Sequence, residues 1–343
     1  MDELFHFDVP AELIAQAPAS PRDHARLLVY DRRTKTLTDD YFYNLANYLP
    51  KNTRVVANNT RVDHCRYLFD SGKVEIFAVE SVNDCTVRAM VRPGRKFRRG
   101  ALLQLDGVEA RVTNVDADGI RTIVFDRPLD APELVRASHV PLPPYIAQND
   151  RLAPEYQTIY AKQSGSLAAP TAGLHFTPEL RQRIAEQFGW EEVTLSVGRG
   201  TFAPLVEENF KTGSLHFEQY SLSSRAFDLI AAAEHVTAVG TTSLRALESV
   251  FSTHTTPSAS DTTGSVPTRT KGLISGRTSL FIRPGYDFRR VDSLITNFHL
   301  PGTSLLLLTE AFVGSRAELE AIYNHALSEL YRFYSFGDAM LIV

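Results

Sequence analysis

The sequence predicts a mixed α/β protein in which a large α/β domain carries an inserted all-β domain. Strand patterns near the N-terminus, a central run of short alternating segments and a later succession of strands and amphipathic helices support this fold class. We therefore expect a discontinuous α/β domain over residues 1–64 and 140–343 and an inserted β domain over residues 65–139. A chain of 343 residues is long enough for two domains.

The first strands are expected in "ARLLVYDR" and "TRVVANNT", which are apolar and β-branched. Between about Lys73 and Phe125, short segments then alternate polar and apolar residues, with Gly, Asp and Asn between them. These segments are "KVEIFAVESV", "CTVRAMV", "ALLQL", "VEARVTNV" and "IRTIVF". No helical periodicity interrupts them, which is typical of a small barrel or sandwich.

From about Glu155 onward, strands and helices alternate. Amphipathic helices are expected in "RQRIAEQFG", "RAFDLIAAAEH" and "LRALESVF", and a long final helix in "ELEAIYNHALSELYRFY". Buried parallel strands are expected in "VTLSV", "VTAVG" and "SLITNF", with "AMLIV" as a closing strand. The Ser-, Thr- and Pro-rich segment Ser252–Thr270 predicts a surface loop.

Composition excludes several classes of protein. The N-terminus lacks the basic-then-apolar order of a signal peptide, and no apolar run approaches the roughly 20 residues of a membrane span. Cys65 and Cys85 form no ligand pattern, so we expect free thiols and no metal. A cytoplasmic monomer without a membrane partner is expected. The net charge of −4 argues against indiscriminate nucleic-acid binding but allows a local basic patch.

One such patch is the turn "RPGRKFRRG". It gathers five basic residues: Arg92, Arg95, Lys96, Arg98 and Arg99. These residues can belong to a solvated hairpin turn that bends at Pro93-Gly94. Alternatively, they can form contacts with phosphate groups.

Three loops share the same order of features: a strand is followed by small or polar residues and then by a helix. The first, "SLAAPTAGLHFTPEL", ends with Thr177 as an expected N-cap and Pro178 at the first helical position. The second is "VTAVGTTSLRALES" and the third is "SLITNFHLPGTSLLLL". Together they carry the candidate site residues Thr171, Ala172, Gly173, His175, Thr241, Thr242, Ser243, Arg245, Asn297 and His299.

These loops predict a shared cleft. Ligands of open α/β sheets bind where parallel strands end, and helix N-termini there favour carboxylate or phosphate. We expect His175 and His299 to face this cleft together with Arg245 and the Thr241–Ser243 turn. Ordinary helix caps and structural histidines are the alternative explanation.

The segment "VTLSVGRGTFA" contains a different pattern, Gly198-x-Gly200-x-x-Ala203, which is seen in dinucleotide-binding folds. Pro204 follows at once, and the strand-like "SLHFEQYSL" comes too soon for a βαβ crossover. A tight glycine turn is the better prediction.

The blocks "AAPTAGLHFT", "AVGTTSLRALES", "TNFHLP" and "YRFYSFGDAM" resemble those of the S-adenosylmethionine:tRNA ribosyltransferase-isomerases of queuosine biosynthesis. The resemblance runs from about Phe7 to Ile342. It implies a mixed α/β domain with an inserted six-stranded β-barrel. It also implies transfer of the ribosyl moiety of S-adenosylmethionine onto 7-aminomethyl-7-deazaguanine at the tRNA wobble position. Epoxyqueuosine is then formed, and adenine and methionine are released.

This resemblance gives the candidate residues expected duties. S-adenosylmethionine is a substrate and not a permanently bound cofactor, and tRNA is the second substrate. The sulfonium acidifies the C5′ hydrogens, so the reaction needs a base, and an acid near the departing adenine. An imidazole can serve in either role, so His175 and His299 are the expected proton-transfer pair. Arg245 and the Thr241–Ser243 turn would hold the methionine carboxylate or a phosphate, and the basic turn would contact tRNA.

The sequence departs from the family pattern at two histidine positions, which are expected on one wall of the cleft. Ser196 replaces one histidine, and Gly213 replaces the first of an H-x-x-H pair of which His216 remains. Two alternatives therefore stay open: a paralogue that uses S-adenosylmethionine with another acceptor, and a non-catalytic RNA-binding protein. An enzyme is favoured over a binding protein by the retained residues His175, Arg245, Asn297 and His299.

Overall fold

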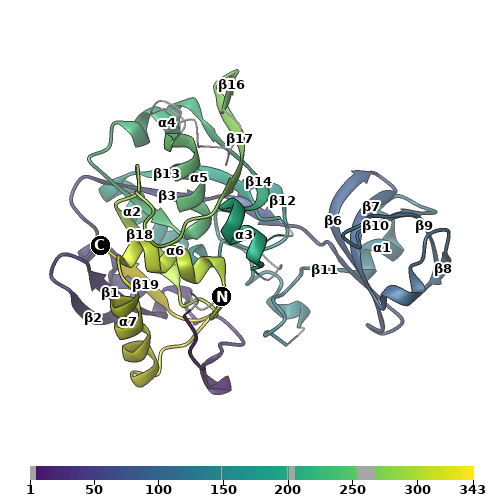
Figure 1. The fold of residues 1–343 in the computed structure, drawn as a ribbon, viewed down its shortest axis with the longest axis horizontal. Helices are drawn as coiled ribbons and strands as arrows, with labels where there is room; N and C mark the ends of the chain where they lie inside the picture. Colours follow the sequence, from purple (N-terminus) through teal and green to yellow (C-terminus); the bar gives the residue numbers. More distant parts are fainter. Residues whose placement is uncertain (1–4, 148, 199, 201–204, 253–266) are drawn as a thin grey trace. The chain divides into compact units, whose positions relative to one another are not determined.

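The computed structural model describes residues 5–147, 149–198, 200, 205–252 and 267–343. Its elements are shown in Figure 1. The chain forms two compact units. The larger consists of Met1–Arg61, Pro143–Ala147 and Pro154–Val343, and the smaller of Val62–Leu142 and Gln148–Ala153.

The larger unit is built on a sheet to which the described residues contribute ten strands. In spatial order the strands are β16 (Thr268–Thr270), β17 (Leu273–Leu280), β14 (Ser214–Ser223), β13 (Trp190–Ser196), β3 (Thr53–Asn58), β15 (His235–Val239), β18 (Ser293–Asn297), β19 (Ala339–Ile342), β1 (Arg26–Asp31) and β2 (Thr36–Tyr41). The neighbours β13, β3, β15 and β18 run parallel, as predicted for "VTLSV", "VTAVG" and "SLITNF". Their carboxyl ends therefore meet at one edge.

Two apolar layers cover this sheet. Along β3, Val56 belongs to one core, whereas Val55 and Ala57 belong to the other. The first core includes side chains of helices α4 (Ser224–Ala231), α5 (Thr241–Ser252), α6 (Ser304–Val313) and α7 (Arg316–Ser328). The second includes side chains of helix α2 (Pro178–Phe188) and the 3-10 helix η3 (Phe42–Asn47). Because both faces of the sheet are buried, the sequences of these strands are continuous apolar runs.

The predicted helices are confirmed, and so is the Thr177 cap, whose hydroxyl accepts the Leu180 backbone N–H. The final helix ends earlier than predicted, at Ser328. Leu330 has a positive φ of 58°, and Tyr331 N–H bonds back to the Ala326 carbonyl. The chain leaves the helix here because Tyr331 and the following Phe333 are fully buried in the first core.

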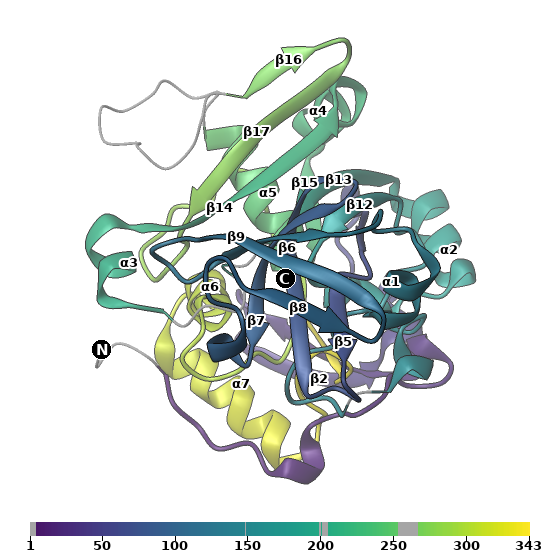
Figure 2. The same ribbon diagram turned by 90° about the vertical axis from the view of Figure 1, so that its right-hand side faces the viewer.

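The smaller unit holds a second, antiparallel sheet, which Figure 2 shows curled on itself. Its order is β11 (Ser138–His139), β5 (Arg66–Phe69), β6 (Val74–Asn83), β7 (Thr86–Arg92), β10 (Arg121–Phe125), β9 (Val108–Val115) and β8 (Leu102–Leu105). The five strands expected between Lys73 and Phe125 are confirmed. The six-stranded barrel is not confirmed, because the described residues contribute seven strands to this sheet, and one of them, β11, has two residues.

Short elements complete the fold. They are α1 (Pro132–Ala137), α3 (Glu207–Thr212), β4 (Thr60–Val62), β12 (Gln163–Ser166) and the 3-10 helices η1 (Ala11–Leu13), η2 (Arg22–His24), η4 (Gly94–Lys96), η5 (Asp150–Leu152) and η6 (Thr171–His175). No helix among the described residues is long and apolar enough to cross a membrane. Cys65 and Cys85 are both free.

The glycine segment after β13 does not open a βαβ unit, because the next strand, β14, pairs antiparallel with β13. This confirms the sequence-based prediction. Arg199, Ala203 and Pro204 of that segment lie outside the described residues, as does most of the predicted surface loop, residues 253–266. At the end of that loop, Thr268–Thr270 forms the edge strand β16.

A buried carboxylate on α5 holds the chain that leads into β18. Glu248 is fully buried, and its oxygens accept the backbone N–H groups of Arg289, Arg290 and Val291 and the Tyr286 hydroxyl. These bonds satisfy donors of an irregular segment that has no strand partner of its own.

Replacing Glu248 with Ala should lower the free energy of unfolding by about 3 kcal/mol or more, because several buried donors lose their acceptor. Urea denaturation measures this change. Glu207→Ala is the control, since Glu207 is exposed and forms only a surface pair with Lys211. Equal losses in the two variants would contradict the anchoring role of Glu248.

Candidate active site

The carboxyl ends of β15 and β18 open into a cavity of about 430 Å³ within the larger unit. All three predicted loops contribute to its wall. The contributing residues from these loops are Ala168, Ala169, Pro170, Thr171, Ala172, Gly240, Thr241, Thr242, Arg245, Thr296, Asn297, Phe298, His299, Leu300, Gly302, Thr303, Ser304 and Leu305. The cavity therefore lies where an open α/β sheet is expected to bind its ligand.

The turn into α5 is held by a glycine and an asparagine. Gly240 has φ 85°, and its N–H donates to the Ile295 carbonyl of β18. Asn58 is fully buried at the end of β3, and its Nδ2 donates to the Thr242 hydroxyl at 3.1 Å and the Leu195 carbonyl at 3.0 Å. Thr241 and Thr242 consequently reach the cavity wall at a fixed position.

Two of the predicted substrate-binding residues do not line the cavity. Ser243 is fully buried, and its hydroxyl donates to the Val239 carbonyl. Gly173 packs beneath Tyr160, where an added Cβ would lie 2.0 Å from the hydroxyl oxygen. Both positions therefore have a structural explanation.

His299 lines the cavity and is 8% exposed. Its Nε2 lies 2.7 Å from the Thr296 hydroxyl, and its backbone N–H donates to the Tyr323 hydroxyl. Burial lowers the pKa of His299 to about 4. The imidazole is therefore neutral near pH 7 and can accept a proton.

His175 is not among the residues that line the cavity. Its Nε2 lies 3.2 Å from Asn297 Nδ2, and its ring packs 5.0 Å from that of Phe42. Burial, with smaller contributions from the charges of Arg332 and Arg22, lowers the pKa of His175 to about 3. His175 thus lies behind Asn297, as a neutral imidazole.

Asn297 connects this histidine to the cavity. Its Oδ1 accepts the Thr171 hydroxyl at 2.9 Å, and its Nδ2 donates to the Tyr334 carbonyl at 3.3 Å. A carbonyl oxygen can only accept, so Tyr334 fixes which end of the amide is Nδ2. His175 Nε2 must then be the acceptor, which leaves its proton on Nδ1.

Arg245 lines the cavity together with an acidic partner. Its Nη1 forms a hydrogen-bonded ion pair with Glu218 Oε2, and its Nε donates to the Leu280 carbonyl. Both side chains are less than a tenth exposed. Arg245 Nη2 has no hydrogen-bond partner in the described part of the chain. The cavity wall therefore carries both a positive and a negative charge, and not an isolated cation.

Several groups at the wall are not among the site residues predicted from the sequence: Glu218, Tyr145, Tyr156, His216, Tyr334 and Ser335. The Tyr145 hydroxyl bonds to Ser335 Oγ at 2.7 Å, and the Tyr145 and Tyr334 rings lie 4.9 Å apart. Tyr334 and Ser335 lie in "YRFYSFGDAM", one of the blocks that resemble the family, so that block carried the available signal.

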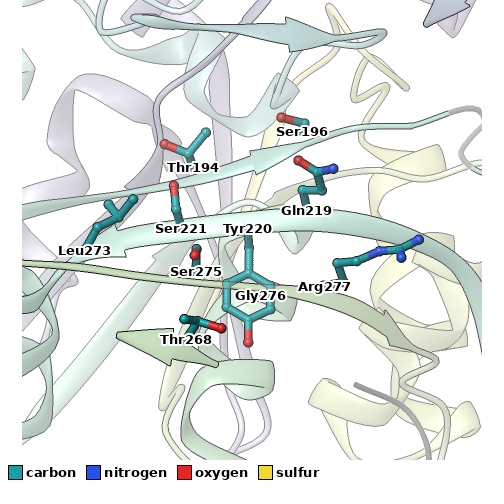
Figure 3. Close-up of a pocket in the computed structure, with 10 residues that line it drawn as sticks. All are labelled: Thr194, Ser196, Gln219, Tyr220, Ser221, Thr268, Leu273, Ser275, Gly276 and Arg277. Carbon is teal, nitrogen blue, oxygen red and sulfur yellow. The ribbon is translucent and has the colours of Figure 1, made fainter. Parts of the chain in front are cut away.

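The two departures from the family pattern do not lie on the cavity wall, contrary to expectation. Ser196 lines a separate hollow on the outer strands (Figure 3). Gly213 ends α3 in the left-handed region, with φ 66°. His216 does line the cavity. Neither Ser196 nor Gly213 therefore contributes to this cavity.

In the smaller unit, the basic turn is anchored by the buried Phe97. The five predicted residues Arg92, Arg95, Lys96, Arg98 and Arg99 are all exposed. Arg92 pairs with Glu75 at 3.1 Å and Lys96 with Asp70 at 3.5 Å. Arg95, Arg98 and Arg99 form no ion pair with any residue that the structure describes. The turn thus presents a net positive surface.

Within the described residues, no cluster of three or more His, Cys, Asp or Glu side chains could hold a metal ion.

Comparison with known proteins identifies what the chain is similar to. The family model for queuosine biosynthesis proteins matches residues 2–342. An S-adenosylmethionine:tRNA ribosyltransferase-isomerase of Gloeobacter violaceus is 42% identical over 100% of this chain and 96% of its own. One of Syntrophomonas wolfei is 39% identical over 99% and 96%. The crystal structure of an S-adenosylmethionine tRNA ribosyltransferase from Thermotoga maritima is 29% identical, covers 98% of this chain and 99% of its own, and has a TM-score of 0.53.

The depressed histidine pKa values predict a stability change with pH. Unfolding restores the ordinary value of 6.5, so between about pH 4 and 6.5 the unfolded chain binds more protons than the folded one. Stability should fall as the pH is lowered through this window, by about 1.4 kcal/mol per pH unit for each buried histidine. Urea denaturation of wild type and His299→Gln at several pH values measures the difference, and identical slopes would contradict the assignment.

Proposed function

The chain belongs to the queuosine biosynthesis protein family, and we propose how its cavity performs the reaction of an S-adenosylmethionine:tRNA ribosyltransferase-isomerase. The enzyme moves the ribosyl moiety of S-adenosylmethionine onto 7-aminomethyl-7-deazaguanine at the tRNA wobble position, forms epoxyqueuosine and releases adenine and methionine. The full-length similarity to enzymes of this name is the observation that carries this conclusion.

The methionine end of S-adenosylmethionine is a zwitterion, and the Arg245–Glu218 pair can meet both of its charges. Arg245 Nη2 supplies a donor for the carboxylate, and Glu218 supplies an acceptor for the ammonium group. The N-termini of α5 and α6, which begin at the cavity wall, add a favourable potential for the carboxylate. This end of the substrate would then lie beside Arg245.

His299 is the proposed base that removes the C5′ proton next to the sulfonium. It lies at the wall, is neutral near pH 7 because burial lowers its pKa to about 4, and is oriented by the Thr296 hydroxyl. The cationic substrate makes that C–H more acidic, which offsets the weakness of such a base.

His175 has an indirect part in this proposal. It lies one hydrogen bond behind Asn297, so it holds the Asn297 amide in the orientation that accepts the Thr171 hydroxyl. Thr171, Ala172 and Asn297 then form one side of the substrate site. We propose this positioning role for His175 in place of direct proton transfer.

The tRNA substrate gives the smaller unit its proposed role. Residues 65–139 would act as a domain of their own that contacts the tRNA backbone through the basic turn. Phosphate contacts of this kind position a nucleic acid without reading its sequence.

The reaction is tested by incubating the protein with S-adenosylmethionine and tRNA that carries 7-aminomethyl-7-deazaguanine. Nucleoside mass spectrometry detects epoxyqueuosine, and a separate assay detects free adenine. Both products are expected. Adenine release without epoxyqueuosine would favour a paralogue with another acceptor, and tRNA binding without either product would favour a non-catalytic protein.

His299→Gln should lower kcat by about a hundredfold or more, because a general base contributes that much to proton transfer. The KM for S-adenosylmethionine should change little. His325→Gln is the matched control, since His325 pairs with Asp39 on the surface of α7 and does not line the cavity. Unchanged turnover of His299→Gln would contradict the assignment of His299 as the base.

The two variants His175→Gln and His175→Ala separate positioning from proton transfer. The Gln side chain can still accept a hydrogen bond from Asn297 Nδ2, so most turnover should remain, whereas His175→Ala should lose it. Circular dichroism checks that both variants are folded. Equal loss of turnover in both would favour direct chemistry by His175.

Salt dependence tests the basic turn. Replacing Arg95, Arg98 and Arg99 with Gln should reduce the slope of log K against log salt for tRNA by about 0.7–0.9 per lost phosphate contact. Arg136→Gln is a control, because Arg136 is 70% exposed in the same unit but outside the turn. A slope equal to that of wild type would show that the turn is an ordinary solvated hairpin that does not contact the tRNA backbone.

A further inference from the structure

A second hollow, of about 470 Å³, lies on the outer strands β13, β14, β17 and β16 (Figure 3). It is lined by Thr194, Ser196, Gln219, Tyr220, Ser221, Thr268, Leu273, Ser275, Gly276 and Arg277. The strand register arranges the polar side chains in two rows across the sheet. One row is Ser196, Gln219 and Arg277, and the other is Thr194, Ser221, Ser275 and Thr268.

The chemistry of this face is unlike that of a core. Its lining consists mainly of hydroxyl and amide side chains, and Arg277 is the one charged residue among the ten. Among the described residues no carboxylate lines it, although the whole chain carries a net charge of −4. The opposite face of the same strands is apolar, with Leu222 and Ile274 buried in the first core. The polar face is therefore suited to an anionic, hydrogen-bonding partner.

An aromatic side chain extends this face along β14. Phe217 precedes Gln219 by two residues, so the two side chains lie on the same side of the strand. Phe217 is 54% exposed, and the Arg277 guanidinium lies over its ring at 4.8 Å from the centroid. An exposed ring beside an arginine is a platform on which nucleic-acid bases stack.

The candidate active site lies on the opposite side of the same strand segment, because side chains alternate between the two faces of β14. His216 and Glu218, the residues on either side of Phe217, line the cavity. A base in the cavity and nucleotides on Phe217 would therefore lie on the two faces of one short segment of β14. An extended protein partner would instead favour unpaired strand edges or apolar pockets, whereas this surface is the polar face of paired strands.

We propose that the Phe217–Arg277 face binds unpaired nucleotides of the tRNA that flank the reacting base, by stacking on Phe217 and by contacts with phosphate at Arg277. This inference rests on the proposed function, because it names tRNA as the occupant. The hydroxyl and amide rows then accept and donate hydrogen bonds to sugars and bases.

The test uses the full-length protein and labelled tRNA that carries 7-aminomethyl-7-deazaguanine, with binding followed by fluorescence anisotropy. Phe217→Leu keeps an apolar side chain but loses the π-face, so the Kd should rise about fivefold or more. Phe217→Trp keeps the π-face and should bind like wild type. Arg277→Gln should weaken binding and reduce the salt slope by about 0.7.

Arg269→Gln is the matched control. Arg269 lies over the Phe227 ring at 4.6 Å on the neighbouring strand β16 but does not line the hollow. Its Kd should stay within about twofold of wild type. The KM for S-adenosylmethionine should be unchanged in every variant, because none of the substituted side chains lines the cavity.

Failure of this inference differs from failure of the proposed function. A wild-type protein that neither binds nor modifies the tRNA would overturn both. A wild type that modifies tRNA, with Phe217→Leu and Arg277→Gln binding it equally well, would overturn the inference and leave the function intact. Equal weakening by Arg269→Gln and Arg277→Gln would show a general charge effect, and would also overturn it.

Discussion

Buried polar groups at the end of β18 need hydrogen-bond partners. The hydrogen bonds of Asn297 meet this need and thereby join three parts of the chain. Its amide links Thr171 and His175 of the first loop to the backbone of Tyr334, more than 35 residues further on. Leaving any of these groups unpaired would cost about 1–3 kcal/mol. The network therefore fixes both the loop geometry and the cavity wall, and the parallel strands β3, β15 and β18 bring its members to one edge.

The electrostatics of the cavity follow from the same burial. Two neutral histidines and an Arg245–Glu218 pair give a site with little net charge, although it contains strongly polar groups. Such a site does not attract anions in general. It suits a ligand that carries both signs of charge, as S-adenosylmethionine does. Exposed positive charges that can meet a polyanion include those of the basic turn and of Arg277.

Local chemistry explains which elements the sequence could predict. The Thr177 cap and the strands β13, β15 and β18 depend on neighbouring residues, and they were predicted. The partnership of Glu218 with Arg245 spans 27 residues and arises only when β14 packs beside α5, so no local pattern signals it. The position of His175 behind Asn297, 122 residues apart, has the same cause. The early end of α7 follows from burial of Tyr331 and Phe333, which competes with helical periodicity.

We propose that the cavity at the ends of β15 and β18 holds S-adenosylmethionine, with its methionine end at Arg245–Glu218 and its ribose at His299. A crystal structure of the complex with S-adenosylmethionine tests this most directly. The C5′ carbon is expected within about 4 Å of a His299 ring nitrogen, close enough for proton transfer. S-adenosylmethionine bound outside this cavity, or with its ribose remote from His299, would contradict it.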